Sequence, residues 1–243
     1  MQNLIITIPV FNEGEMASIN TEKIYDFCNK YLNQLIDWKI VLTENGSTDN
    51  TFKIIQKIEK KYPNKVLAYH FDNRGKATAI KCAWAKLEKE KYKIDLISII
   101  DVDIPFDLKF FLQAIKEILD HNYDLVIGNR YSRISKTSRP FDQIIVSKTY
   151  NFLSRLFLKI KIHDIQCGLK IFKYKTLKKY LPFCDHPHGF FDLQIVKKLT
   201  ENKHYIKEIP INWNESNNRP TKFIKRKEVF EGIKTLFKLI IKS

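Results

Sequence analysis

The sequence predicts an α/β fold: a doubly wound, mostly parallel sheet with helices on both faces, followed by a C-terminal amphipathic helix. Apolar, β-branched runs alternate with helical patterns through the first half of the chain, as in parallel sheets. Short polar clusters follow several of these runs, at the strand ends where such sheets bind ligands. With 243 residues, 44% of them hydrophobic, the chain can bury the core of one large domain.

The expected strands and helices alternate in regular order through the first half. The strands are expected at residues 4–10, 39–43, 66–71, 96–101 and 125–129. The helices between them are expected near residues 21–36, 49–61, 76–91 and 107–121. Because the carboxyl ends of parallel strands share one edge of the sheet, the polar clusters that follow them should meet there.

The pattern changes after this region. Residues 131–142 are polar and basic and have no hydrophobic period, so we expect a loop that could serve as a mobile lid. A helical pattern follows at residues 143–160, with an apolar face that suits either the core or a lipid surface. Without an internal repeat or a linker, residues 1–213 are expected to form one domain.

Residues 214–243 form a basic C-terminal segment with apolar positions at helical spacing from residue 229 onward. Its basic side chains are Arg219, Lys222, Lys225, Arg226, Lys227, Lys234, Lys238 and Lys242. Two alternatives are open for this segment: a helix packed on the core, or an interfacial helix whose lysines meet anionic lipid head groups.

The formal net charge of +15 allows a nucleic-acid-binding protein as a remote alternative. Only seven of the 42 basic residues are arginine, however, and arginines interleaved with aromatic residues are typical of RNA-binding surfaces. We therefore expect no nucleic-acid partner.

The cellular location is expected to be cytoplasmic, peripheral on the cytosolic face of a membrane. No apolar run approaches the length that spans a bilayer, and the N-terminus has no basic signal-peptide region. Cys28, Cys82, Cys167 and Cys184 lack metal-ligand spacing and are expected to be reduced thiols.

Asp101 and Asp103 end the fourth predicted strand, and residues two apart in a strand point to the same face. Paired carboxylates there suit Mg²⁺ or Mn²⁺ carrying a nucleotide diphosphate. The alternative is two solvated loop acids. Five of the seven glycines lie in polar clusters beside apolar runs, which favours a rim that a ligand approaches closely.

Several short motifs occur together in a specific order. They are Ile8-Pro9-Val10-Phe11-Asn12-Glu13, Asn45-Gly46-Ser47-Thr48-Asp49-Asn50-Thr51, Asn73-Arg74-Gly75-Lys76, Asp101-Val102-Asp103, Ile127-Gly128-Asn129-Arg130-Tyr131, Gln166-Cys167-Gly168-Leu169-Lys170 and Glu208-Ile209-Pro210-Ile211-Asn212-Trp213. In these motifs the chain resembles inverting GT-A glycosyltransferases, and within them the dolichyl- or polyprenyl-phosphate glucose and mannose synthases. The resemblance implies a metal-dependent hexosyltransferase with a GT-A fold.

The resemblance implies one set of residues for the nucleotide sugar: Pro9, Phe11, Glu13, Glu44, Lys76, Asp101, Val102 and Asp103. Glu44 stands where the family usually has an aspartate. Asp101 and Asp103 would bind the Mg²⁺ or Mn²⁺ ion that bridges the diphosphate. The donor would be of the UDP-glucose or GDP-mannose type.

The resemblance also implies that Arg130, Gln166 and Lys222 face the phosphates of acceptor or donor. A dolichyl or polyprenyl phosphate is mostly dianionic at pH 7, so it is a nucleophile without a general base. The alternative is a glycan hydroxyl acceptor with Asp192 as the base, and a third interpretation of Asp192 is an acid stabilised by a helix N-terminus. A homo-oligomer and a membrane-anchor partner are both open.

Overall fold

The computed structural model describes residues 1–72, 75–186 and 190–215, together with residues 234, 236 and 239. Its central sheet has seven strands in the order β3-β2-β1-β4-β7-β5-β8. The strands are β1 (Asn3–Val10), β2 (Asp37–Glu44), β3 (Val66–His70), β4 (Leu96–Ile99), β5 (Leu125–Asn129), β7 (Lys170–Lys173) and β8 (Ile206–Pro210). All five predicted strands are present, with small shifts at their ends.

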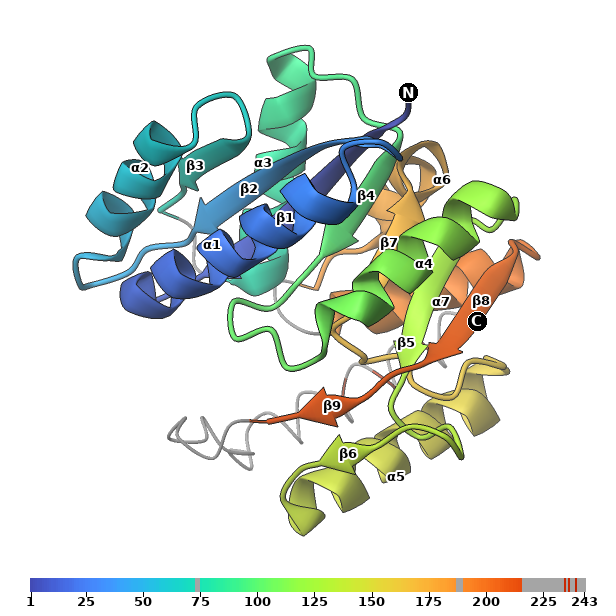
Figure 1. Ribbon diagram of the computed structural model, residues 1–243. Coiled ribbons are helices and arrows are strands. Elements are labelled where there is room, and N and C mark those ends of the chain that lie inside the picture. Colours follow the sequence, from blue (N-terminus) through green and yellow to red (C-terminus); the bar gives the residue numbers. More distant parts are fainter. Residues whose placement is uncertain (73–74, 187–189, 216–233, 235, 237–238, 240–243) are drawn as a thin grey trace.

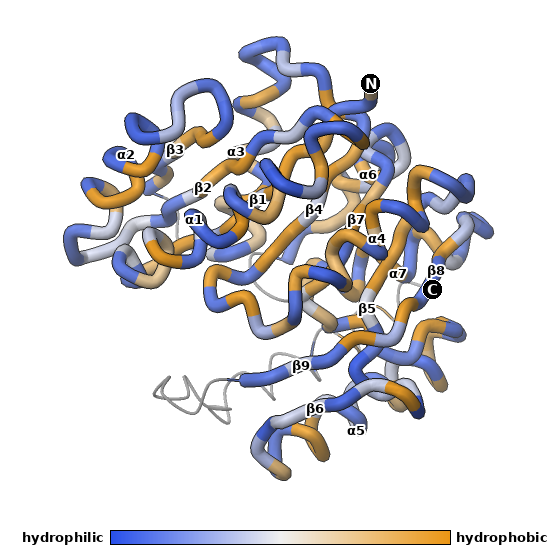
Figure 2. Tube along the Cα trace, in the orientation of Figure 1, coloured by the Kyte–Doolittle hydropathy of each residue, from blue (hydrophilic) through white to orange (hydrophobic). Residues whose placement is uncertain are grey.

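Most neighbouring strands run parallel, and β7 alone among the strands of this sheet is antiparallel to its neighbours β4 and β5. The central strands β1, β4 and β5 are nearly continuous apolar runs because helices cover both of their faces. Figure 2 shows this apolar layer through the middle of the molecule.

Helices lie on both faces of the sheet, which confirms the predicted doubly wound architecture (Figure 1). The helices α1 and α4 lie on one face, and α3, α6 and α7 lie on the other. Their bounds are α1 Gly14–Tyr31, α2 Thr51–Lys61, α3 Lys76–Lys89, α4 Leu108–Asp120, α6 Tyr174–Tyr180 and α7 Phe191–Glu201. A short 3₁₀ turn, η1 (Leu181–Phe183), follows α6.

The predicted bounds of the first helix were wrong at both ends. Helix α1 starts at Gly14, where the backbone N–H of Glu13 donates to Thr51 Oγ1 (3.1 Å), a contact that only the folded chain provides. It ends at Tyr31, and residues 32–35 form a turn that places Leu32 and Ile36 in the core.

The segment expected to be a loop contributes regular structure. Residues Thr137–Ser138 form β6, which pairs in parallel with β9 (Trp213–Asn214), and helix α5 (Phe141–Leu158) begins two residues earlier than predicted. In Figure 1 this β6·β9 ribbon and α5 lie apart from the layered body. No helix within the described residues is long and apolar enough to cross a membrane.

The predicted C-terminal helix falls almost wholly outside the described residues. Of its apolar positions, Leu236 is buried and Leu239 packs against the core. At these two positions the apolar face is turned toward the protein, as in the first of the two alternatives. The remaining residues of the segment, Lys222 among them, lie outside the described part.

Candidate active site

The candidate site lies where the carboxyl ends of β2, β1 and β4 meet. These three strands are parallel neighbours, so the loops that follow them share one edge of the sheet. Pro9 is the half-buried next-to-last residue of β1, and the half-buried Phe11 follows the strand in the first loop. The polar clusters therefore meet as the sequence predicted.

The first and second loops are tied together by Asn12. Its side-chain amide donates to Thr48 Oγ1 (3.3 Å) and accepts from the Thr48 backbone N–H (2.9 Å), and its own backbone N–H donates to Ser47 Oγ (3.0 Å). Both Asn12 and Gly46 have positive φ angles, of 52° and 74°. The Asn45–Thr51 motif thus fixes the wall of the site, while Asp49 accepts from the Thr51 N–H (2.9 Å) at the start of α2.

Glu44 lies buried at the end of β2, beneath these loops. Its carboxylate accepts from the backbone N–H of Ser47 and contacts Nδ1 of His70 on β3. The hydrogen bond to Glu44 raises the pKa of His70, against the opposing effect of burial, and Asp72 raises it further from 3.1 Å. His70 is a member of the site that sequence reasoning missed.

The Asp101–Asp103 segment continues β4 into a tight turn. Val102 is buried and its carbonyl accepts from Asn20 Nδ2 (2.7 Å), while Asp101 and Asp103 are partly exposed. Ile104 closes the turn by donating its N–H to the Asp101 carbonyl (3.0 Å) and has a φ of 42°, which is unusual for a β-branched residue.

Lys76, the first residue of α3, forms an ion pair with Asp101. Burial lowers the pKa of the Lys76 ammonium, but the charges of Asp101, Asp192 and Asp103 outweigh that effect and leave it above its usual value. The ammonium therefore stays charged among three carboxylates. Such a group suits the binding of a diphosphate, because it supplies a fixed positive charge beside the predicted metal ligands.

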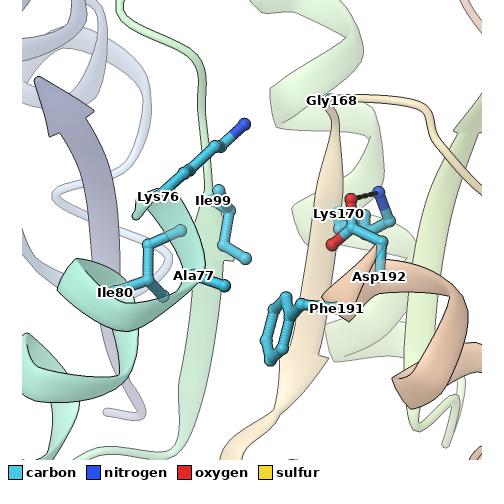
Figure 3. Close-up of a pocket in the computed structure, with 8 residues that line it drawn as sticks. All are labelled: Lys76, Ala77, Ile80, Ile99, Gly168, Lys170, Phe191 and Asp192. Atoms are coloured by element: carbon cyan, nitrogen blue, oxygen red, sulfur yellow. Dashed lines mark hydrogen bonds and ion pairs between the residues drawn. The ribbon is translucent and has the colours of Figure 1, made fainter. Parts of the chain in front are cut away.

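A small cavity of about 20 Å³ lies between α3 and α7, enough for about one water molecule. Figure 3 shows Lys76 on one side of it and Asp192 with Lys170 on the other. The buried Lys170 of β7 donates to Asp192 Oδ2 (2.9 Å) and to the Cys167 carbonyl. Asp192 lies in the first turn of α7, as expected for the helix-terminus alternative.

Gly168 leaves space that a side chain would fill. A Cβ atom at this position would lie 3.0 Å from Asp101 Oδ2 and 3.0 Å from the Trp213 ring.

The sequence contained a signal for Lys170, which interrupts the apolar run from Leu169 to Phe172. A charged residue in a buried strand needs a partner, and here that partner is Asp192.

Arg130 has a partner that the sequence did not reveal. Its Nε lies 2.7 Å from Asp164 Oδ2, and one terminal nitrogen lies 2.8 Å from Oδ1 in a bidentate pair. Burial alone would lower the pKa of Arg130, but the Asp164 carboxylate raises it above its usual value, so the guanidinium stays charged. The central carbon of the Arg130 guanidinium, Cζ, lies 4.8 Å from the centre of the Trp213 ring. Gln166 lies half-buried in the turn that follows Asp164.

Asp101 and Asp103 are the residues expected to ligate a metal ion. No cluster of three or more His, Cys, Asp or Glu side chains suited to a metal ion occurs in the described part of the chain. Asp101 and Asp103 supply two hard carboxylates, and Mg²⁺ or Mn²⁺ commonly takes one or two carboxylates and completes its shell from phosphates and water. The donor set fits an ion that arrives with a nucleotide diphosphate.

Comparison with known proteins identifies the family. The profile of glycosyl transferase family 2 matches residues 5–181, well over half of the chain. The chain belongs to glycosyl transferase family 2. In this family 2 chain the matched part contains both aspartates, Lys76 and all strands of the central sheet except β8, and it begins within β1.

Curated relatives share low but extended identity with this family 2 chain. The glycosyltransferase AglD of Haloferax volcanii is 22% identical over 209 residues, covering 86% of this chain and 32% of the relative. The dolichyl-phosphate beta-glucosyltransferase of Saccharomyces cerevisiae is 28% identical, covering 87% and 67%. The polyprenol monophosphomannose synthase of Mycolicibacterium smegmatis is 24% identical, covering 88% and 78%. The chain thus spans about a third of the first relative and two thirds or more of the other two.

Solved structures confirm the GT-A fold. Glucosyl-3-phosphoglycerate synthase from Mycobacterium tuberculosis, in complex with UDP, superposes with a TM-score of 0.71 at 17% identity, covering 98% of this chain and 79% of that one. The mannosyltransferase PcManGT from Pyrobaculum calidifontis, in complex with GDP-Man and Mn²⁺, gives 0.66 at 16% identity, covering 99% and 64%. At these identities the likeness establishes the fold alone.

Proposed function

We propose that this chain transfers a sugar from a nucleotide diphosphate donor, of the UDP-glucose or GDP-mannose type, to a dolichyl or polyprenyl phosphate with inversion. The observation that carries the proposal is the grouping of Asp101, Asp103 and Lys76 at the strand ends. Two relatives, named for transfer to dolichyl phosphate and for polyprenol monophosphomannose synthesis, support the choice of acceptor.

Asp101 and Asp103 would hold a divalent cation together with the donor diphosphate. Such an ion, when bound, neutralises charge on the departing nucleotide diphosphate. Solved neighbours with Mn²⁺ in their complexes support a divalent ion, either Mn²⁺ or Mg²⁺. Lys76 would add a positive charge beside the donor diphosphate.

The donor's nucleoside would lie against the first two loops, near Pro9, Phe11, Glu13 and the buried Glu44. An oxygen of the acceptor phosphate would then attack the anomeric carbon of the sugar from the opposite side. The bond from that carbon to the diphosphate oxygen breaks, and the nucleotide diphosphate leaves with its electron pair. Because the phosphate dianion has no proton to lose, this step needs no general base.

Asp192 distinguishes a phosphate acceptor from a glycan hydroxyl acceptor. Lys170 already engages its carboxylate at 2.9 Å, which supports a role in positioning the sugar rather than in taking a proton. Asp192→Asn should therefore keep substantial turnover with a polyprenyl phosphate, whereas Arg130→Lys should lose turnover because the bidentate pair with Asp164 is broken. The opposite ranking would indicate a hydroxyl acceptor and a base at Asp192.

Helix α5 supports a peripheral membrane contact, which we propose on the cytosolic face. Its largest exposed side chains are Phe141 (76% exposed), Phe152 (61%) and Leu156 (58%). Basic residues are exposed along the same helix and just after it, namely Lys148, Arg155, Lys159 and Lys161. Apolar side chains flanked by cations suit a surface of anionic lipids, where the lipid acceptor would reside.

The decisive test is turnover with a panel of UDP- and GDP-sugars and a short polyprenyl phosphate. We expect transfer from one donor class, loss of that transfer in excess EDTA, and recovery with Mn²⁺ or Mg²⁺. Full activity in EDTA would remove the metal role proposed for Asp101 and Asp103. Transfer only to glycan hydroxyls would overturn the proposed acceptor.

A further inference from the structure

A groove of about 550 Å³ lies beside the site, over strand β9. It lies between residues 103–107 and strand β6, with Phe106 and Trp213 among its apolar lining residues and Lys136 and Ser138 among its polar ones. The backbone holds this arrangement, because Trp213 N–H donates to the Lys136 carbonyl (2.8 Å) and Asn214 N–H to the Pro105 carbonyl (2.7 Å). Its volume is that of a small-molecule binding site.

One end of the groove lies at Asp103, beside the candidate active site. Asp103 lines it, and the Trp213 ring lies against both Gly168 and the Arg130 guanidinium. The indole N–H of Trp213 is buried and has no hydrogen-bond partner among the described residues. The Arg130 guanidinium does not itself line the groove and is held by Asp164, so it acts as a fixed charge behind the Trp213 ring. Together with this indole N–H, it suits a phosphate at this end of the groove.

The other end approaches helix α5. Ser138 lines the groove three residues before the helix begins, and Arg139 joins the two elements. The Arg139 guanidinium contacts Glu215, just after β9, at 2.9 Å and Gln143 of α5 at 3.3 Å. The groove therefore lies between the reacting centre and the helix with the exposed apolar face.

One wall of the groove is apolar, formed by Ile104, Pro105, Phe106 and Trp213, while the other lining residues are polar or charged. Ile104 and the buried Pro105 continue the surface of Phe106 and Trp213, whose ring centres are 6.1 Å apart. The positive φ of Ile104 is a strained conformation for a β-branched residue, and it occurs on the wall between Asp103 and this surface. Strain of this kind commonly persists at ligand-binding sites because the surrounding structure fixes it.

We propose that this groove binds the first isoprenoid units of the acceptor, with the phosphate at the Asp103 and Arg130 end. This inference rests on the proposed function, since it assumes a lipid phosphate acceptor. The proposal assigns recognition of the acceptor's isoprenoid chain to β6, β9 and residues 104–106. These residues take no part in donor binding as proposed above. A soluble glycan would gain little from the apolar surface, whereas each added isoprene unit would bury more of it.

The test fills the groove with a large side chain. Ser138→Trp and Asn214→Trp place an indole at exposed positions of the groove lining, where backbone pairing is independent of the side chain. Ile134→Trp is the matched control, because Ile134 is 74% exposed in the same segment and does not line the groove. Transfer is measured with prenyl phosphates of one and three isoprene units, and UDP or GDP binding with Mn²⁺ is measured by calorimetry.

In the parent protein, kcat/KM should rise with the number of isoprene units. In both groove variants this rise should shrink by about tenfold or more, while nucleotide binding and the Ile134→Trp control stay unchanged. An unchanged rise in both groove variants, or an equal loss on both acceptors, would overturn the groove assignment. A parent protein that binds nucleotide but transfers to neither prenyl phosphate would instead refute the proposed acceptor, and with it the occupant of the groove.

Discussion

Helices α4 and α5 contain similar apolar side chains, but α4 buries apolar residues whereas three of the four residues that α5 buries are polar. Helix α4 buries Phe111, Ala114, Ile115 and Ile118, the apolar face that its sequence period predicts. Helix α5 buries Ser147, Asn151, Ser154 and Leu158. Its exposed large side chains are Phe141, Ile145, Val146, Phe152, Leu156 and Phe157.

Two of the three buried polar residues of α5, Ser147 and Asn151, have internal hydrogen-bond partners. Ser147 Oγ lies 2.5 Å from the Tyr131 hydroxyl, and Asn151 accepts from the Ile165 backbone N–H at 3.0 Å. These hydrogen bonds offset the cost of burial, so the polar face is a specific inner surface. An outward apolar face of this size indicates a second apolar environment, which we propose to be lipid. The comparison therefore places α4 in the folded core, whereas α5 would lie at a membrane surface under this proposal.

The largest expected effect concerns the aspartates just before α4. Asp103→Ala should reduce transfer by roughly a hundredfold or more with every acceptor, because it removes a proposed metal ligand without opening a core cavity. Asp120→Ala, at the exposed far end of α4, is the matched control and should be silent. If Asp103→Ala lost transfer with lipid acceptors alone, Asp103 would act in lipid binding and not in the chemical step.

A direct test of the two helices compares one phenylalanine in each. Phe111→Ala should lower the free energy of unfolding by about 3–5 kcal/mol, because Phe111 is fully buried against the sheet. Phe152→Ala in α5 should change it by no more than about 0.5 kcal/mol, since the side chain is 61% exposed. Urea denaturation measures both values. Equal losses would mean that α5 belongs to the core.

Membrane binding should respond in the opposite way. Phe157→Glu in α5 should weaken binding to anionic liposomes by about tenfold, because it removes buried apolar area and adds a repelled charge. Gln113→Glu adds a negative charge on the exposed side of α4 and should leave binding unchanged. Liposome sedimentation with both variants gives the comparison, and equal binding by Phe157→Glu would place the lipid contact elsewhere.

The smallest expected effect is the pH dependence of stability in the sheet-packed region. The contact with Glu44 raises the folded-state pKa of His70 above its unfolded value of about 6.5, against the effect of burial. The stabilisation of the folded state by protonated His70 is therefore fully present below a pH of about 6.5. It is lost as the pH rises through the raised pKa of His70 in the folded state. His70→Asn should flatten part of the decrease in stability above that pH, because it removes the ion pair with Glu44. Denaturation of the parent protein and of His70→Asn across the pH range tests this expectation.

The local sequence pattern was enough to predict the parallel strands and the location of the candidate site. The alternation of apolar runs and helical periods predicted the five parallel strands, and the positions of Asp101 and Asp103 at a strand end predicted where the site lies. These predictions succeed because strand period and chain order are properties of neighbouring residues. Strands β7 and β8 and helix α6 escaped prediction, and α7 was anticipated only as the helix-terminus alternative for Asp192, since no regular alternation continues beyond residue 130.

Tertiary structure decided which charges meet and which way α5 faces. Arg130 finds Asp164 34 residues away, and Lys170 finds Asp192 22 residues away, so neither pairing is a property of a local motif. The sequence of α5 allowed its apolar face to point to core or lipid alike. The outcome depended on the partners that Ser147 and Asn151 find in Tyr131 and Ile165, because buried polar groups must be paired whereas apolar groups need only a surface that excludes water.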